Sequence, residues 1–183
     1  MASTIVRPAD AFVIEGGHPL SGRVRASGNK NGALPILAAC LLTDEPVTLM
    51  NLPRIRDVET MMGLLSQLGA EVEWTGSNEA RIHAQDISHE VDEALASRIR
   101  ASFLLAGPLL SRLGLASVPP PGGDVIGRRR LDPHIHAFAE LGAGFEFGER
   151  YELSGKLRGA HIHLDEASVM ATENAVMAAT LAP

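Results

Sequence analysis

Apolar and polar residues follow each other along this chain with two periods, one typical of helices and one typical of strands. The segments Asn31–Leu42 and Arg100–Leu110 are nearly continuous runs of apolar residues, which predict buried helices. Val58–Leu68 places its apolar residues on one helical face and stops before Gly69. Glu71–Trp74 alternates as a half-buried strand does. The pattern therefore predicts a chain in which helices and strands are mixed.

This order of elements occurs twice. The sequence Leu68–Ala70, Leu-Gly-Ala, returns as Leu141–Ala143 at the end of another predicted helix, Ile135–Leu141, about 70 residues later. Ala167–Leu181 resembles the start of a third copy. Because such repeats usually need about three copies to close a core, we expect the array to continue beyond this chain. The predicted strands are Pro46–Met50, Glu71–Trp74 and Ala80–Ala84 in the first copy, and Leu115–Val118, Gly144–Phe147 and His161–Leu164 in the second.

The predicted helices are apolar on most of their faces, which bears on the fold class. Exposed helices of this kind would form large apolar patches, so other elements must cover them. We therefore expect an α/β protein in which sheets pack around central helices.

Composition and charge narrow the class of protein. The chain has 183 residues, of which 45% are hydrophobic and 21% charged, so a globular core is expected rather than disorder. The net charge of −6 argues against a general nucleic-acid binder. No apolar run reaches the roughly 20 residues of a membrane span, and the N-terminus has no signal-peptide pattern. A single cysteine, Cys40, fits a reducing compartment, so we expect a cytoplasmic protein that binds no nucleic acid and no membrane.

The first candidate site precedes the first apolar helix, in the segment Ser27–Gly32. Glycine and asparagine favour a turn there, and the helix that follows offers free N–H groups. With Lys30 added, the segment fits a phosphate or other anion site. An ordinary capped helix start is the alternative.

The second candidate site is Pro119–Arg130, where three prolines and two glycines precede Asp124 and three consecutive arginines. This composition suits a mobile loop with a hinge at the glycines. A carboxylate beside guanidinium groups can exchange a proton with an anionic substrate, so Asp124 is a candidate acid. A solvated turn with surface charge is the alternative.

Other polar residues give weaker signals. Arg100 opens an apolar helix, where a cation opposes the helix dipole, and this hints at function. Two His-x-His pairs would each share one face of a strand, but no cysteine or carboxylate cluster with ligand spacing accompanies them, so we expect no metal. Cys40 lies within an apolar helix and is expected to be inert core. The histidine pairs are His134 with His136 and His161 with His163.

Four segments in order resemble motifs of one enzyme family, the UDP-N-acetylglucosamine 1-carboxyvinyltransferases, which are enolpyruvyl transferases. They are Gly28–Ala39, Arg100–Phe103, Pro121–Asp132 and Gly159–Val169. The resemblance runs from Phe12 to Pro183. It implies an inside-out α/β barrel of repeated βαβαββ units, incomplete here, in an enzyme more than twice this length.

The same resemblance implies a division of the chain. Residues 1–22, with a strand over Phe12–Gly17, would belong with a second domain that is missing here. Residues 23–183 would form most of the first enolpyruvyl transferase domain, as about two repeats plus the start of a third.

The resemblance implies transfer of enolpyruvyl from phosphoenolpyruvate to the 3′-hydroxyl of UDP-N-acetylglucosamine, with release of phosphate. This is the first committed step of peptidoglycan synthesis, and the family uses no metal or organic cofactor. The expected partners are these two substrates and the missing C-terminal half, without which the chain is expected to be inactive. The alternatives are an enolpyruvyl transferase with another acceptor and a domain that binds a nucleotide sugar without catalysis.

Site residues also follow from the resemblance. Asp124 stands where the family more often has a cysteine, and it would be the proton donor on the loop, so the enzyme is expected to resist fosfomycin, which alkylates that thiolate. Arg128 and Arg130 replace a small residue and a proline, and Glu166-Ala167 replaces a frequent Lys-Val pair. Matching positions imply that Lys30 is catalytic, that Lys30, Asn31 and Arg129 bind phosphoenolpyruvate, and that Arg100, Arg129, Leu131, Asp132, Ser168 and Val169 bind UDP-N-acetylglucosamine.

Overall fold

A computed structural model describes residues 13–123, 127 and 129–183. The first repeat folds into helices and an antiparallel sheet with the strand order β1-β3-β2. In chain order its elements are the helix α1 (Lys30–Ala39), the 3-10 helix η2 (Cys40–Leu42), β1 (Val47–Met50), α2 (Arg56–Gln67), β2 (Glu71–Gly76) and β3 (Glu79–His83).

The second repeat follows the short helix α3 (Glu93–Ala96) and has the equivalent strand order β4-β6-β5, also antiparallel. The internal repeat predicted from the sequence is therefore confirmed. Its elements are the 3-10 helix η3 (Arg100–Leu105), α4 (Ala106–Leu113), β4 (Leu115–Val118), α5 (Asp132–Glu140), β5 (Gly144–Phe147) and β6 (Tyr151–Ser154), and the final helix is α6 (Val169–Ala179).

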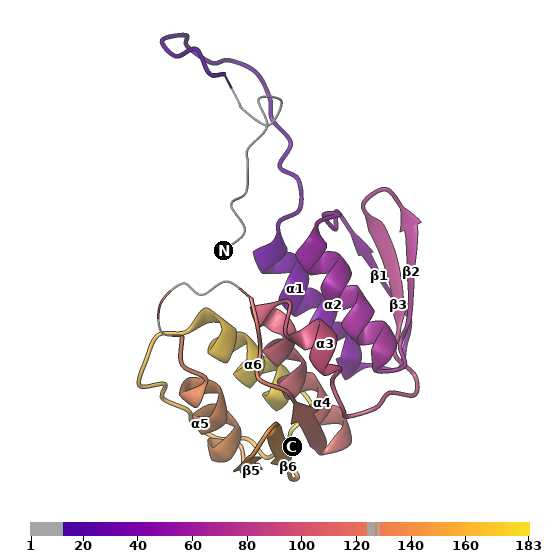
Figure 1. Ribbon diagram of the computed structural model, residues 1–183, viewed down its shortest axis with the longest axis vertical. Helices are drawn as coiled ribbons and strands as arrows, with labels where there is room; N and C mark the ends of the chain where they lie inside the picture. Colours follow the sequence, from indigo (N-terminus) through magenta and orange to yellow (C-terminus); the bar gives the residue numbers. More distant parts are fainter. Residues whose placement is uncertain (1–12, 124–126, 128) are drawn as a thin grey trace.

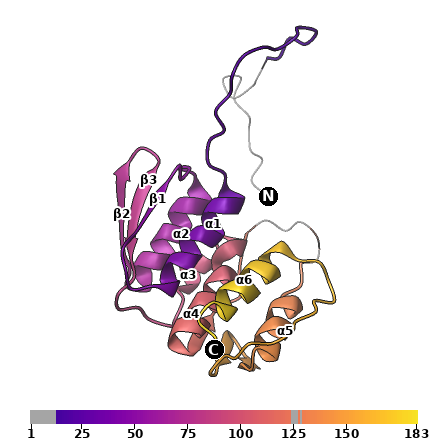
Figure 2. The same ribbon diagram turned by 180° about the vertical axis from the view of Figure 1, so that it is seen from behind.

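The two sheets lie at the outside and most of the helices stand between them, whereas α5 lies at an edge (Figures 1 and 2). In Figure 1 the sheet of β1, β2 and β3 stands beside α1 and α2, while β5 and β6 lie near α4 and α5 at the other end. The largest fully buried side chains come from both repeats and include Phe103, Phe138 and Leu37. These side chains belong to one contiguous cluster, so the two repeats share one core. Burial of each such side chain stabilises the fold by about 1.5–3 kcal/mol. None of the described helices is long and apolar enough to cross a membrane.

Asn174 of α6 explains why the second apolar run does not open as a regular α-helix. Its side-chain oxygen accepts from the N–H of Gly107 at 2.9 Å, and its side-chain nitrogen donates to the carbonyl of Phe103 at 2.8 Å. In an α-helix these two backbone groups would bond each other. Because an amide from another helix replaces that bond, Arg100–Leu105 is a 3-10 helix and α4 begins at Ala106.

Three predictions differ from the structure. His161–Leu164 alternates as a strand does, but the third strand of the second sheet is Tyr151–Ser154. The chain turns at Gly155, and the carbonyl of His163 is then 3.1 Å from His136 Nε2 on α5, so the segment runs along a helix. Residues 13–17 form no strand and are exposed, with no sheet edge beside them, whereas Phe12 lies outside the described residues. The second apolar run opens as a 3-10 helix.

Candidate functional site

Three adjoining pockets share Arg100 and Arg129, and they measure about 520, 320 and 270 Å³. Together they gather every predicted site residue that the structure describes. Leu131 and Asp132 line the 520 Å³ pocket, Lys30 and Asn31 line the 320 Å³ pocket, and Ser168 and Val169 line the 270 Å³ pocket. Asp124 and Arg128 lie outside the described residues.

Lys30 is the first residue of α1. Its Nζ lies 2.7 Å from Asp57 Oδ2, in the first turn of α2. The helix start itself is closed by Asn29, whose side chain accepts from the N–H of Gly32 at 3.0 Å, as a typical N-cap does. The segment is therefore a capped helix start, and it also places Lys30 in the wall of a pocket. Sequence reasoning missed Asp57, since an acidic residue in a first helical turn is common.

Gly28 sets the position of this turn. Its N–H donates to Asn51 Oδ1 at 3.1 Å, and a Cβ at Gly28 would overlap the carbonyl oxygen of Asn51. Only glycine lets the two backbones approach this closely. The glycine before Lys30 is therefore required by packing, which fixes where α1 begins.

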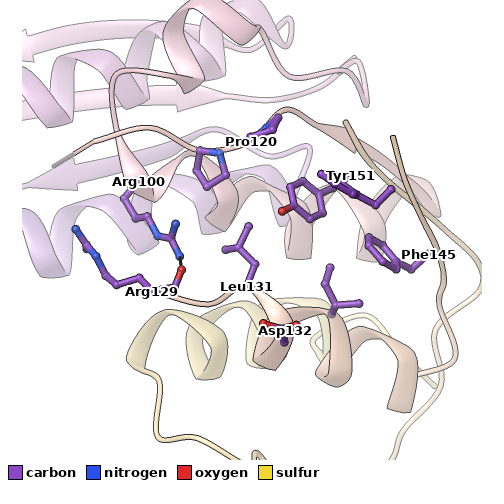
Figure 3. A pocket seen from close by; sticks show the side chains of 10 residues that line it. Arg100, Pro120, Arg129, Leu131, Asp132, Phe145 and Tyr151 are labelled. Atoms are coloured by element: carbon purple, nitrogen blue, oxygen red, sulfur yellow. Dashed lines mark hydrogen bonds between the residues drawn. The ribbon is translucent and has the colours of Figure 1, made fainter. Parts of the chain in front are cut away.

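Arg100 connects the three pockets. Its Nη2 donates to the carbonyl of Arg129 at 2.7 Å and lies 3.4 Å from that of Arg130, so its guanidinium faces the start of α5 (Figure 3). Burial, and secondly the charge of Arg129, lower the pKa of Arg100. An arginine remains charged at neutral pH even so. Hydrogen bonds to backbone carbonyls thus hold the Arg100 guanidinium in place, although a cation at a helix start opposes the helix dipole. These carbonyls do not neutralise its charge.

The glycines before the predicted loop pack closely against the segment that ends at Arg100. The N–H of Gly122 donates to the carbonyl of Ala96 at 3.2 Å, and a Cβ at Gly122 would overlap the backbone of Ser97. These glycines, predicted as a hinge, therefore provide a close contact at the base of the segment. The contact places Gly123 in the wall of the pocket that also holds Lys30.

An aromatic group lines the largest pocket. The ring of Tyr151 lies 4.5 Å from the ring of Phe147 and 6.0 Å from that of Phe145, between centroids. Figure 3 shows the Tyr151 hydroxyl pointing toward the side of the pocket that carries Arg100. Burial raises the pKa of Tyr151. The sequence analysis missed this group, because alternation alone does not show which face of a strand is covered.

His134 forms part of the wall of the 270 Å³ pocket. It is 2% exposed, and its Nδ1 lies 3.0 Å from Asn174 Nδ2. Because the amide nitrogen carries only hydrogens to donate, Nδ1 is the acceptor and the ring is neutral. Burial, and secondly the charge of Arg100, lower its pKa to about 4.

The remaining candidates for metal binding or thiol chemistry lie elsewhere. No group of three His, Cys, Asp or Glu side chains suited to a metal occurs within the described part of the chain. Cys40 is buried, as predicted, and burial raises its pKa to about 11. A thiol in this state is a poor nucleophile.

The cations that line the site suit it to anion binding. Lys30, Arg100 and Arg129 line one pocket of about 320 Å³, at the start of α1 where the helix dipole is positive. Cations placed in this way stabilise negative charge that develops in a transition state. Beside it, the aromatic wall of the largest pocket offers apolar surface to a larger ligand.

Comparison with known proteins identifies relatives of the chain. The family model of EPSP synthase (3-phosphoshikimate 1-carboxyvinyltransferase) matches residues 14–183. A UDP-N-acetylglucosamine 1-carboxyvinyltransferase of Bradyrhizobium diazoefficiens is 57% identical over 93% of this chain, and one of Treponema denticola is 50% identical over the same share. The matches cover 40% and 41% of those proteins, so the chain spans less than half the length of these relatives.

Solved structures have the same fold. The enolpyruvyl transferase NikO from Streptomyces tendae matches 91% of this chain with a TM-score of 0.66 and 23% identity, over 39% of its own length. EPSP synthase from Acinetobacter baumannii matches 88% of this chain with a TM-score of 0.68 and 16% identity, over 38% of its own length. The expected enolpyruvyl transferase fold is therefore confirmed, as a partial domain.

Proposed function

The chain belongs to the EPSP synthase family, and from this premise we propose that it is the N-terminal part of a UDP-N-acetylglucosamine 1-carboxyvinyltransferase. The enzyme transfers enolpyruvyl from phosphoenolpyruvate to the 3′-hydroxyl of UDP-N-acetylglucosamine and releases phosphate. It acts in the cytoplasm, in the first committed step of peptidoglycan synthesis. The 57% identity to a relative of that name favours this acceptor over that of EPSP synthase.

One observation carries the proposal: Lys30, Arg100 and Arg129, which are far apart in sequence, line the same pocket. Phosphoenolpyruvate bears a phosphate and a carboxylate, so it needs several cations around a small volume. Lys30 and Arg129 bind these groups, with Asn31 beside them at the start of α1. When C3 of phosphoenolpyruvate is protonated, the same cations stabilise the charge that develops.

The nucleotide sugar occupies the neighbouring pockets. Arg100 and Arg129 reach its phosphates, because both side chains line all three pockets. Leu131 and Asp132 contact its nucleoside, and Ser168 and Val169 begin α6 at the rim of the 270 Å³ pocket.

Asp124 is the proposed proton donor. A carboxylic acid donates a proton when nearby anions and exclusion of water raise its pKa. An aspartate has no thiolate to be alkylated, so the enzyme resists fosfomycin. The residue lies outside the described part of the chain, and its role rests on its place in the motif Pro121–Asp132.

The rest of the assignment concerns how the chain fits into the longer enzyme. Residues 1–22 belong with the second domain and residues 23–183 with the first. The second domain completes the site, so this chain alone is inactive. A domain that binds the nucleotide sugar without catalysis is the second candidate, because Arg100, Leu131 and Asp132, which are proposed to hold that substrate, line one pocket of this chain.

The decisive experiment measures phosphate release by the complete gene product given both substrates. We expect release only when both are present, and a loss of at least about a hundredfold in Asp124→Asn, as is typical for removal of a general acid. Binding of UDP-N-acetylglucosamine without phosphate release would favour the second candidate. Rapid inactivation by fosfomycin with a mass adduct on this chain would contradict the resistance.

A further inference from the structure

Arg130 faces three carboxylates at the rim of the 270 Å³ pocket. Its Nε lies 3.0 Å from Asp132 Oδ2, and its Nη1 lies 3.8 Å from Asp165 Oδ2 and 3.7 Å from Glu166 Oε2. Arg130 and Glu166 line that pocket directly. We call these four side chains the rim cluster. One guanidinium therefore offsets charges that come from two separate segments of the chain.

The two segments joined by the rim cluster carry the proposed nucleotide contacts. Arg130 follows Arg129 and precedes α5, whereas Glu166 precedes Ser168, whose side chain caps α6 by accepting from the N–H of Ala171 at 3.2 Å. The segment between β6 and α6 has no regular secondary structure, and backbone hydrogen bonds fix its first part, up to Gly159. Arg130 thus lies within 4 Å of carboxylates from both segments.

Charge is the second consequence of this arrangement. Three carboxylates and one guanidinium leave the rim cluster with a net charge of about −2, beside the pocket in which Arg100 and Arg129 attract anions. The bond to Asp132 raises the pKa of Arg130, which stays positive at any physiological pH. Without Arg130, an anionic ligand would meet a pocket rim that carries one positive charge fewer.

We propose that Arg130 is a positioning and specificity residue for the diphosphate-bearing substrate, because it offsets the acidic rim and ties the segment before α6 to the start of α5. This inference rests on the proposed function and extends it to a residue with no assigned role. The side chains of the rim cluster are 40–67% exposed, and exposed ion pairs add little to stability. The effect is therefore expected in substrate binding rather than in unfolding.

The test replaces Arg130 in the complete gene product. Arg130→Met should raise the KM for UDP-N-acetylglucosamine about three- to tenfold at low ionic strength, since one charge several Å from a diphosphate changes binding by that order. The kcat and the KM for phosphoenolpyruvate should change less than about twofold. Arg130→Lys should recover most of the loss, and Glu166→Gln added to Arg130→Met should recover part of it. About 0.5 M salt should shrink all these differences.

The matched control is Arg81→Met, which removes an exposed arginine of β3 that lines none of the three pockets. It should leave both KM values unchanged. If Arg130→Met leaves the KM and the calorimetric Kd for the nucleotide sugar unchanged in an active parent enzyme, the inference fails alone. A parent that neither turns over nor binds the nucleotide sugar overturns the proposed function, and the inference falls with it.

Discussion

The two repeats begin alike and differ in what their first cation meets. In the first repeat, Lys30 at the start of α1 lies 2.7 Å from the carboxylate of Asp57, at the start of α2. In the second, Arg100 at the start of η3 donates instead to the carbonyl of Arg129, just before α5. Both contacts join the start of the first helix of a repeat to the region where its second helix begins, but only the contact of Lys30 is an ion pair. In the second repeat the cation is therefore held by a backbone carbonyl, which does not neutralise its charge.

The second helices differ as well. When Leu68 is aligned with Leu141, α2 has 12 residues and α5 has 9, so α5 lacks the first turn. The residues in place of that turn, which include Arg129 and Leu131, line the pockets instead. The second repeat thus has pocket-lining residues at the positions where the first repeat has one more helical turn.

The sheet faces reflect the same difference. In the first sheet, Val72 and Trp74 pack against the core, whereas the aligned Phe145 and Phe147 of the second sheet are 41% and 58% exposed. The uncovered aromatic face forms the wall of the largest pocket. At these aligned positions, therefore, the first sheet turns its side chains to the shared core, and the second sheet leaves aromatic rings exposed beside a pocket.

The largest expected effect comes from removing the cation of the first repeat. Lys30→Met in the complete gene product should reduce kcat about 10²- to 10³-fold, because loss of one preorganised charge costs about 2.7–4 kcal/mol of transition-state stabilisation. Steady-state phosphate release measures it. Arg56→Met, a control in the first turn of α2 that lines none of the three pockets, should stay within about twofold of the parent. A Lys30→Met enzyme with near-parent kcat would place the catalytic anion site elsewhere.

The second prediction removes the hydrogen bonds between the Asn174 side chain of α6 and the backbone of the second repeat. Asn174→Leu should lower the free energy of unfolding by about 3 kcal/mol, because in the present 3-10 geometry it leaves the N–H of Gly107 and the carbonyl of Phe103 buried without partners. Chemical denaturation measures the change. Val176→Ala on the same helix is the control, since Val176 is 62% exposed and should cost under about 0.5 kcal/mol. Equal losses in the two variants would contradict the account.

The third prediction concerns how stability depends on pH at one aligned position, which is His134 in the second repeat and Met61 in the first. Burial lowers the pKa of His134 to about 4, against about 6.5 when unfolded. A histidine with a depressed folded pKa is held neutral, so the unfolded state binds the proton first as pH falls. Stability should be fully present above about pH 6.5 and should fall by about 2 kcal/mol between pH 7 and 5.

His134→Met gives the second repeat the residue that the first repeat has, and it should flatten this part of the pH profile. Denaturant unfolding at several pH values measures both proteins. His136→Met is the control for the same substitution at an exposed position of the same helix. An unaltered pH dependence in His134→Met would assign it to other groups.

The smallest effect compares the two sheet faces. Trp74→Ala should lower the free energy of unfolding by about 2 kcal/mol, since the ring packs on the core and carries the Arg54 guanidinium 4.2 Å from its centroid. Phe147→Ala, at the aligned position, should cost less than about 1 kcal/mol because the ring is already exposed. Thermal unfolding compares them. A larger loss for Phe147→Ala would mean that its face is covered.

Much of the fold could be predicted from periodicity. The repeat around Leu68 and Leu141 and the stop of each second helix follow from apolar spacing and glycine. The strand expected at His161–Leu164 was wrong, because alternation does not distinguish a sheet edge from a segment lying along a helix. The 3-10 opening at Arg100 was not predictable either, since it depends on Asn174, a residue distant in sequence.

The candidate site was predictable in part. Lys30 and the Pro119–Arg130 segment have distinctive local sequences, and residues from both line one pocket. Asp57, Tyr151 and the contacts of Arg130 were not predictable, because each gains its place only when separate segments meet. That Asp124 donates the proton stays a prediction.

The amide of Asn174 also has a consequence for the order in which the polypeptide can mature. Until residue 174 has left the ribosome, the N–H of Gly107 and the carbonyl of Phe103 must find water or each other. The 3-10 helix over Arg100–Leu105 therefore reaches its final hydrogen bonding only after residue 174 has emerged. Nascent chains arrested before residue 174 should be more sensitive to protease near Phe103 than chains arrested after the whole of α6 has emerged.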